Sequence, residues 1–131
     1  MGKPVILCVD DEITILQSLK RQLYQAFENN YLYEMAESAD EALEVIEDLL
    51  EEETDIIVIV SDWLMPGMKG DEFLIEVHKN FPKIVKILLT GQAEQEAIEQ
   101  VKIKANLHQY LSKPWDDREL IDCIKSGIAK L

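Results

Sequence analysis

Short apolar runs alternate along the chain with longer segments in which apolar residues recur every three or four positions. Continuous runs of Val, Ile and Leu are typical of strands that are covered on both faces. They occur at residues 4–9, 55–61, 84–90 and 108–112, with a weaker candidate at 31–36. The recurring apolar residues predict amphipathic helices, which run through residues 15–27, 42–50, 73–77, 97–101 and 120–128.

This alternation of strands and helices predicts a doubly wound α/β fold. Each pair of parallel strands needs a crossover connection, which a helix packed on a sheet face provides. Such crossovers are right-handed. Two helix starts carry the pattern of a capping box, Ser38 with Glu41 and Asp116 with Glu119. The length of 131 residues fits a single domain, 1–131, built around one core.

Charge narrows the range of partners. The formal net charge is −13, from 26 Asp and Glu against 13 Lys and Arg, so neither nucleic acid nor an anionic membrane surface is an expected partner. Residues 34–55 hold eleven of the acidic residues and no Lys or Arg. This pattern favours a solvated helix face over a metal-binding or protein-docking surface.

The cysteines and histidines indicate structural roles. Cys8 and Cys123 lie in apolar runs without metal-ligand spacing, which predicts buried thiols. His78 and His108 are isolated and are interpreted as structural or solvated residues rather than metal ligands. The sequence shows no pattern of an export signal or a membrane span, so we expect a cytoplasmic protein.

Polar residues follow the ends of four predicted strands. These residues are Asp10-Asp11-Glu12, Ser61-Asp62, Thr90-Gly91 and Lys113-Pro114. Each has an ordinary interpretation when it is taken alone, such as a helix cap or a turn. The carboxyl ends of parallel strands meet at one edge of a sheet, however, and ligands bind in the crevice outside that edge. Their joint placement therefore predicts a site.

The chemistry of this set favours a magnesium site that handles a phosphoryl group. Carboxylates from neighbouring strand ends repel each other, and the pKa of at least one rises unless a cation lies between them. Mg²⁺ prefers oxygen ligands and typically takes one or two protein carboxylates together with water and phosphate oxygens. A Lys ammonium and a Thr hydroxyl could hold the remaining phosphoryl oxygens. The arrangement suits an acyl phosphate.

The motifs that carry a family resemblance are Asp10-Asp11, the run Asp62-Trp63-Leu64-Met65-Pro66-Gly67-Met68-Lys69-Gly70, Thr90-Gly91 and Tyr110-Leu111-Ser112-Lys113-Pro114. Together they resemble the receiver domain of two-component response regulators. Thr90 and Lys113 follow Asp62 by 28 and 51 positions, and the likeness covers essentially the whole chain. It implies a flavodoxin-like sheet with strand order 2-1-3-4-5, flanked by five helices.

The resemblance also implies a role for each site residue. Asp62 would be the nucleophile that takes a phosphoryl group from a histidine kinase and becomes an aspartyl phosphate. Asp11, Asp62 and the backbone carbonyl of Leu64 would ligate Mg²⁺, and Asp10 would act through water. Lys113 would pair with the phosphoryl oxygens. The chemistry would be self-directed, so the domain would not be a turnover enzyme.

A switch is implied as well. Thr90 would move its hydroxyl onto the phosphate, Tyr110 would turn inward to fill the vacated space, and the Lys113–Pro114 peptide bond would be cis. The output face would cover roughly residues 94–131, the fourth helix, fifth strand and fifth helix. A sensor histidine kinase or phosphotransfer protein would dock on the first helix near residues 13–16.

Two neighbouring residues invite further interpretation. Leu64, two positions after Asp62, cannot position an attacking water by hydrogen bonding, which predicts slow self-dephosphorylation unless Gln92 serves instead. Trp115 after Lys113-Pro114 is interpreted as packing under the last helix, with a partner-docking anchor as the alternative. The Lys-Pro-Trp run resembles that of receiver domains at the front of longer regulators, so an output or kinase module after residue 131 is an expected partner. A homodimer partner is the other expectation.

Other functions fit the residues less well. A magnesium-dependent phosphohydrolase using Asp62 as nucleophile would usually place a second acid where Leu64 stands. A flavodoxin-like FMN-binding protein would need a hydroxyl- and Gly-rich phosphate loop after the first strand, where Asp10-Asp11-Glu12 would repel the phosphate. A fold used only as a docking platform would not need the acidic set and Lys113.

Overall fold

The computed structural model describes residues 2–91 and 95–131, and within these ranges a five-stranded parallel sheet has the order β2-β1-β3-β4-β5. The strands are β1 (Val5–Val9), β2 (Leu32–Ala36), β3 (Ile56–Asp62), β4 (Val85–Thr90) and β5 (Gln109–Ser112). The helices are α1 (Ile13–Phe27), α2 (Ala39–Glu51), α3 (Gly70–Asn80), α4 (Gln95–Lys104) and α5 (Asp117–Ile128), with a 3-10 turn η1 (Glu28–Asn30). The doubly wound fold and its strand order are therefore confirmed.

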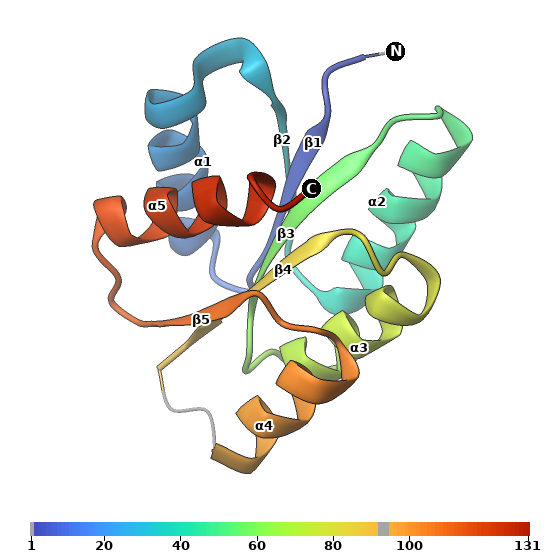
Figure 1. Ribbon diagram of the computed structural model, residues 1–131, viewed down its shortest axis with the longest axis vertical. Helices are drawn as coiled ribbons and strands as arrows, with labels where there is room; N and C mark the ends of the chain where they lie inside the picture. The colour runs from blue at the N-terminus through green and yellow to red at the C-terminus, as the bar shows by residue number, and fades with distance from the viewer. Residues whose placement is uncertain (1, 92–94) are drawn as a thin grey trace.

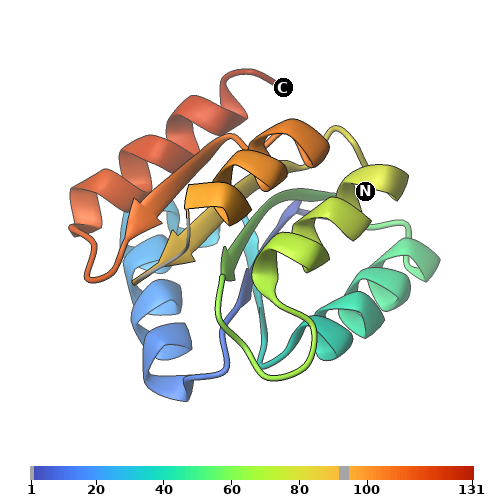
Figure 2. The same cartoon turned by 90° about the horizontal axis from the view of Figure 1, so that it is seen from below.

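The helices cover both faces of the sheet. Helices α1 and α5 lie on one face, and α2, α3 and α4 lie on the other (Figures 1 and 2). Strand β1 supplies both cores in alternation, because successive side chains of a strand point to opposite faces. Val5, Leu7 and Val9 join the core under α2, α3 and α4, whereas Ile6 and Cys8 join the core under α1 and α5.

The two expected capping boxes have different outcomes. Asp116 forms a complete capping box with Glu119 at the start of α5. At the start of α2, the Ser38 hydroxyl accepts a hydrogen bond from the Glu41 backbone N–H at 3.0 Å, as expected. The Glu41 carboxylate, however, accepts from the backbone N–H of Glu37 at 3.3 Å, one residue before the cap.

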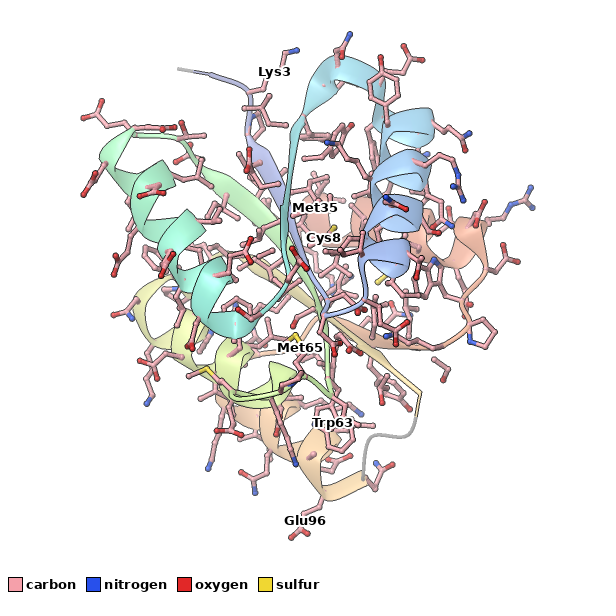
Figure 3. All side chains as sticks on the ribbon, turned by 180° about the vertical axis from the view of Figure 1, so that it is seen from behind. Lys3, Cys8, Met35, Trp63, Met65 and Glu96 are labelled. Atoms are coloured by element: carbon pink, nitrogen blue, oxygen red, sulfur yellow. The ribbon has the colours of Figure 1, made fainter. Side chains whose placement is uncertain are left out.

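Both thiols are buried, as the sequence indicates, and Cys8 lies within the sheet (Figure 3). Burial raises the pKa of Cys8 to about 12 and that of Cys123 to about 11. The His108 Nε2 atom lies 3.1 Å from the carbonyl oxygen of Cys123 and 2.9 Å from the Ser126 hydroxyl, a structural role. In the described ranges no helix combines the length and apolar character needed to cross a membrane.

Candidate functional site

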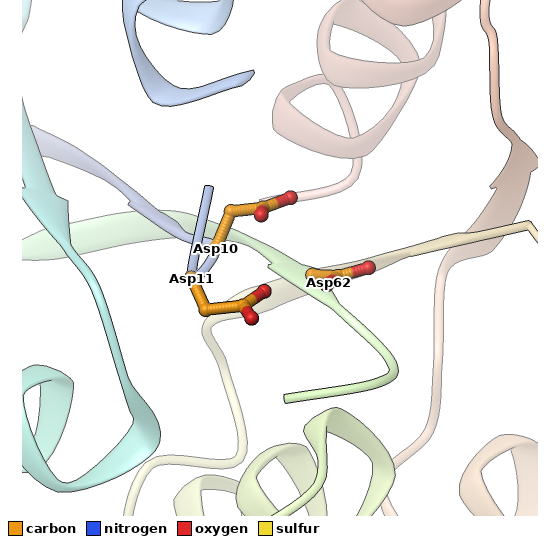
Figure 4. Close-up of side chains that lie close together, drawn as sticks. All are labelled: Asp10, Asp11 and Asp62. Atoms are coloured by element: carbon orange, nitrogen blue, oxygen red, sulfur yellow. The ribbon is translucent and has the colours of Figure 1, made fainter. Parts of the chain in front are cut away.

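The sheet brings the expected site residues to one edge. Asp62 and Thr90 are the last residues of β3 and β4, while Asp10 and Lys113 directly follow β1 and β5. All four strands are parallel, so their carboxyl ends face the same way. Carboxylate oxygens of Asp10, Asp11 and Asp62 lie within 4.8 Å of one another, and the side chains extend toward a common space (Figure 4).

Lys113 joins this acidic cluster directly. Its Nζ atom lies 3.0 Å from Asp10 Oδ2 and 2.9 Å from Asp62 Oδ1. Asp10 is fully buried, and its other oxygen accepts a hydrogen bond from the Glu12 backbone N–H at 2.9 Å. The buried Asp10 carboxylate is therefore compensated by a cation and a peptide N–H, as a buried charge requires. The sequence did not foresee the ion pair between Lys113 and Asp10.

Burial and charge act in opposite directions on the site. Burial is the largest cause that raises the pKa of Asp62, and the negative charges of Asp10 and Asp11 add to it, while the hydrogen bond from Lys113 opposes them. For Lys113, burial favours the neutral amine, but its bonds to Asp62 and Asp10 raise its pKa above the ordinary value. The expected rise at one carboxylate is confirmed, with burial rather than repulsion as its main cause.

Backbone hydrogen bonds fix the strand ends relative to one another. The Lys113 N–H donates to the Thr90 carbonyl at 2.9 Å, and the Trp63 N–H donates to the Leu89 carbonyl at 2.9 Å. The loop after β3 then returns, with the Gly70 N–H donating to the Trp63 carbonyl at 2.8 Å. These hydrogen bonds align the carboxyl ends of the strands, so that the site residues lie at the same level along the strand direction.

Gly70 meets a steric requirement that pattern reading did not identify. A Cβ atom there would collide with the carbonyl group of Asp62. Only glycine lets the start of α3 approach the strand end this closely. The sequence signal for this requirement is the glycine that ends the Asp62–Gly70 run.

The remaining site residues are distributed around this centre. Thr90 is buried, and its exposed fraction is 5%. Tyr110 is 37% exposed and carries the Lys102 ammonium 5.5 Å from its ring centroid, so its ring faces outward in this structure. Leu64 is 62% exposed. Gln92, and Glu94 at the start of the expected output face, lie outside the described residues.

The donor set fits a magnesium ion. Its three carboxylates supply only oxygen, the donor that Mg²⁺ prefers, and Asp11 is exposed to solvent, which leaves room for bound water. Asp10 already binds Lys113 and the Glu12 N–H. Both carboxylate oxygens of Asp10 are thus already engaged within the protein.

Comparison with known protein families identifies the family of this chain. The family model for the response regulator receiver domain matches residues 6–125. The chain belongs to the response regulator receiver domain family. The receiver domain is 36% identical over 123 residues to the hydrogenase transcriptional regulatory protein HoxA of Cupriavidus necator, covering 94% of this chain and 24% of HoxA.

Further relatives support the same conclusion. The receiver domain is 31% identical over 129 residues to the sensor kinase CckA of Brucella abortus, covering 98% of this chain and 13% of CckA. A CheY-like receiver domain from Methanospirillum hungatei superposes with a TM-score of 0.85 at 32% identity, covering 98% of this chain and 96% of that one. The chain thus spans a quarter or less of the length of HoxA and CckA but nearly all of the CheY-like receiver domain.

Proposed function

We propose that Asp62 is the phosphoacceptor of this receiver domain. The contact between Lys113 Nζ and Asp62 Oδ1, 2.9 Å long, carries the proposal. A lysine ammonium held against one oxygen of a buried carboxylate is already placed to meet the negative oxygens of an arriving phosphoryl group. The pair lies at the carboxyl edge of a doubly wound sheet, where ligands of such folds bind.

The proposed reaction moves one phosphoryl group. A carboxylate oxygen of Asp62 forms a new P–O bond as the P–N bond of a kinase phosphohistidine breaks, and the electron pair of that bond returns to the imidazole. Asp62 must be ionised to attack, and the Lys113 ammonium favours that form against the effect of burial. The product is an aspartyl phosphate on this chain, so each molecule reacts with its own site and does not turn over a separate substrate.

Asp11, Asp62 and the Leu64 carbonyl would hold Mg²⁺, with Asp10 acting through water. When bound, Mg²⁺ supplies charge neutralisation for the oxygens of the phosphoryl group. The protein's own groups then divide the remaining work. Asp10 holds Lys113 in place through a 3.0 Å contact, and Lys113 compensates the charge at Asp62.

Phosphorylation would act as a switch. It adds close to two negative charges and new hydrogen-bond acceptors at a buried position. We propose that Thr90, at the neighbouring strand end, supplies a hydroxyl and that the outward ring of Tyr110 turns inward. The face formed by α4, β5 and α5 would transmit this change to an output module or a second copy. A histidine kinase would dock beside Ile13 of α1, which is 54% exposed.

Mass spectrometry tests the phosphoacceptor. We expect phosphoramidate or acetyl phosphate with Mg²⁺ to add a single phosphate that hydroxylamine removes, as it does from an acyl phosphate. Asp62→Asn should abolish the adduct, and chelation of Mg²⁺ should suppress it. The matched control is Asp48→Asn on the exposed side of α2, which should label like the unchanged protein. Labelling that persists in Asp62→Asn would refute the assignment.

Thermal unfolding gives an independent reading of the same site. Beryllofluoride mimics a phosphoryl group on a carboxylate, and a ligand that binds only the folded state raises its melting temperature. We expect a rise that needs both Mg²⁺ and beryllofluoride and that Asp62→Asn removes. An equal rise in the variant would place the ligand elsewhere.

A further inference from the structure

The loop from β5 to α5, residues 113–116, is tied down along its length. At its start, the Lys113 backbone N–H donates to the Thr90 carbonyl at 2.9 Å. At its end, Asp116 caps α5 with a capping box. Between them, the Trp115 indole Nε1–H donates to Gln22 Oε1 of α1 at 2.9 Å. This bond joins the loop to an element far away in the sequence.

Helix α1 is a firm point of attachment. Its inner side chains, Leu16, Leu19 and Leu23, are buried in the core under α1 and α5, and the partly buried Trp115 packs against the same core. The helix also begins directly after the acidic turn, where the Glu12 N–H holds Asp10 Oδ1 at 2.9 Å. Helix α1 therefore contacts Trp115, two residues after Lys113, while the turn at its start contacts Asp10, the ion-pair partner of Lys113.

A lysine needs such support to hold a fixed position. Its four-carbon stem is flexible, and ordering it costs conformational entropy. The Lys113 side chain is 20% exposed, so solvent reaches part of it. The position of its backbone consequently decides whether the ammonium reaches both Asp10 and Asp62. Trp115, two residues further on, is the loop residue whose side chain is anchored on α1.

We propose that Trp115 is a positioning residue for the phosphoryl-transfer site: its hydrogen bond to Gln22 braces the β5–α5 loop against α1 and so holds Lys113 between Asp10 and Asp62. The inference rests on the proposed role of Asp62 and adds a residue to it. It adds to the expected packing under the last helix, where Trp115 does pack against the core, because the indole N–H is also used within the chain. A docking anchor would act only when a partner protein is present.

The test measures phosphorylation by phosphoramidate, a donor too small to contact Trp115 as a protein would. Trp115→Phe keeps an aromatic ring and removes the N–H, and Gln22→Met removes the acceptor. Gln22→Glu keeps an acceptor oxygen and serves as the conservative rescue. Gln25→Met, at an exposed position of α1, is the matched control. Rates are taken at saturating donor and Mg²⁺, well below each variant's melting temperature, so that they refer to folded protein.

We expect Trp115→Phe and Gln22→Met each to lower the maximal labelling rate three- to tenfold, and the double variant to be no slower than the slower single variant. Gln22→Glu and Gln25→Met should match the unchanged protein. A purely structural contact would lower melting temperatures without changing the rate per folded molecule. Unchanged rates in Trp115→Phe and Gln22→Met would therefore overturn the proposal.

A second measurement keeps this proposal separate from the proposed function. The backbone amide shift of Lys113 can be followed by NMR without any phosphoryl donor. A change of the Lys113 amide signal in both Trp115→Phe and Gln22→Met, but not in Gln25→Met, supports the brace. This result supports it even if neither the unchanged protein nor any variant is labelled at Asp62. An unmoved Lys113 signal would overturn it. Failure of labelling throughout would refute the phosphoacceptor assignment alone.

Discussion

Two lysines at opposite ends of the sheet, the partly buried Lys113 and the buried Lys86, have opposite electrostatic surroundings. Lys113, at the carboxyl edge, contacts Asp10 and Asp62, and these bonds raise its pKa. Lys86, near the amino end of β4, is 1% exposed, and burial lowers its pKa to about 8. Its Nζ donates to the carbonyl oxygens of Ile84 at 2.7 Å and Pro82 at 3.5 Å. Throughout residues 2–91 and 95–131, no carboxylate forms an ion pair with it.

The difference shows that burial alone does not make a lysine part of a site. Both ammonium groups lose hydration, which disfavours the charged form. Around Lys113 this cost is offset by two carboxylates, which in turn need the cation. Among the described residues, Lys86 is compensated by the peptide carbonyls of Ile84 and Pro82. The charges at the carboxyl edge therefore stabilise one another, whereas the buried Lys86 forms no ion pair with any residue that the structure describes.

Removing each ammonium gives the largest contrast. Lys113→Met leaves Asp10 and Asp62 as neighbouring buried carboxylates, so we expect a loss of about 3 kcal/mol in the free energy of unfolding at pH 7 without metal. Phosphoramidate labelling should fall on the order of 100-fold. Lys86→Met removes a buried charge but deprives the Ile84 carbonyl of a donor, so its stability should stay within about 1 kcal/mol. Its labelling should be unchanged.

Urea unfolding with chelator present measures both stabilities, and intact mass measures labelling. If Lys86→Met were destabilised as much as Lys113→Met, the two lysines would be equivalent and the comparison would be wrong. Added Mg²⁺ should restore more stability to Lys113→Met than to the unchanged protein, because that variant has no other cation between Asp10 and Asp62.

Two glycines extend the comparison to packing at the two ends. Gly70→Ala places a Cβ against the backbone of Asp62, which cannot shift without moving the site. We expect a loss of about 2 to 3 kcal/mol and slower labelling. Gly127→Ala in α5 meets the side chains of Val85 and His108 instead. These are side chains rather than backbone, and alanine favours the helix, so a smaller loss of about 1 to 2 kcal/mol is expected. Chemical denaturation ranks the two variants, and an equal loss would contradict the argument.

The smallest effect is a pH dependence that belongs to Lys86. Its pKa falls from 10.5 in the unfolded chain to about 8 in the folded protein. Between these pH values the unfolded chain binds more protons, so stability rises with pH. We expect Lys86 to contribute on the order of 2 kcal/mol of added stability between pH 8 and pH 10. The cysteine thiols, whose pKa values are raised, act in the opposite direction above pH 9.

Comparison with Lys86→Met isolates this contribution, because the thiols are the same in both proteins. As pH rises from 8 to 10, the unfolding free energy of the unchanged protein should increase relative to that of the variant. Parallel pH profiles would show that Lys86 has an ordinary pKa in the folded state.

Sequence patterns predicted the central strands β1, β3 and β4 well, because their apolar runs are covered on both faces. The expectation of two-sided coverage was wrong for the run at 108–112, because β5 is an edge strand whose side chains are mostly exposed. The apolar run at 84–90 predicts a strand even though it contains Lys86, and β4 spans Val85–Thr90. The pattern does not indicate that the lysine is buried, since a lysine near a strand end usually reaches solvent. The local backbone carbonyls of Pro82 and Ile84 decide its position.

At the site, the sequence identified which residues meet but not how they are paired. Asp10, Asp62, Thr90 and Lys113 were expected at one edge because parallel strands end there. The contact of Lys113 with Asp10 and the bond from Trp115 to Gln22 span 103 and 93 positions. Such contacts depend on the relative placement of separate strands and helices, which local spacing does not encode.

By itself, the sequence determined the alternating elements, the edge at which the acids and the lysine gather, and the family to which these motifs point. Local periodicity and chain order are sufficient for these, because a strand must bury its apolar faces and parallel strands share a direction. Only the tertiary structure decided that Lys113 pairs with both Asp10 and Asp62, which glycine lets the backbone approach and which helix holds the tryptophan. Those outcomes depend on distances of a few ångströms between elements that only packing brings together.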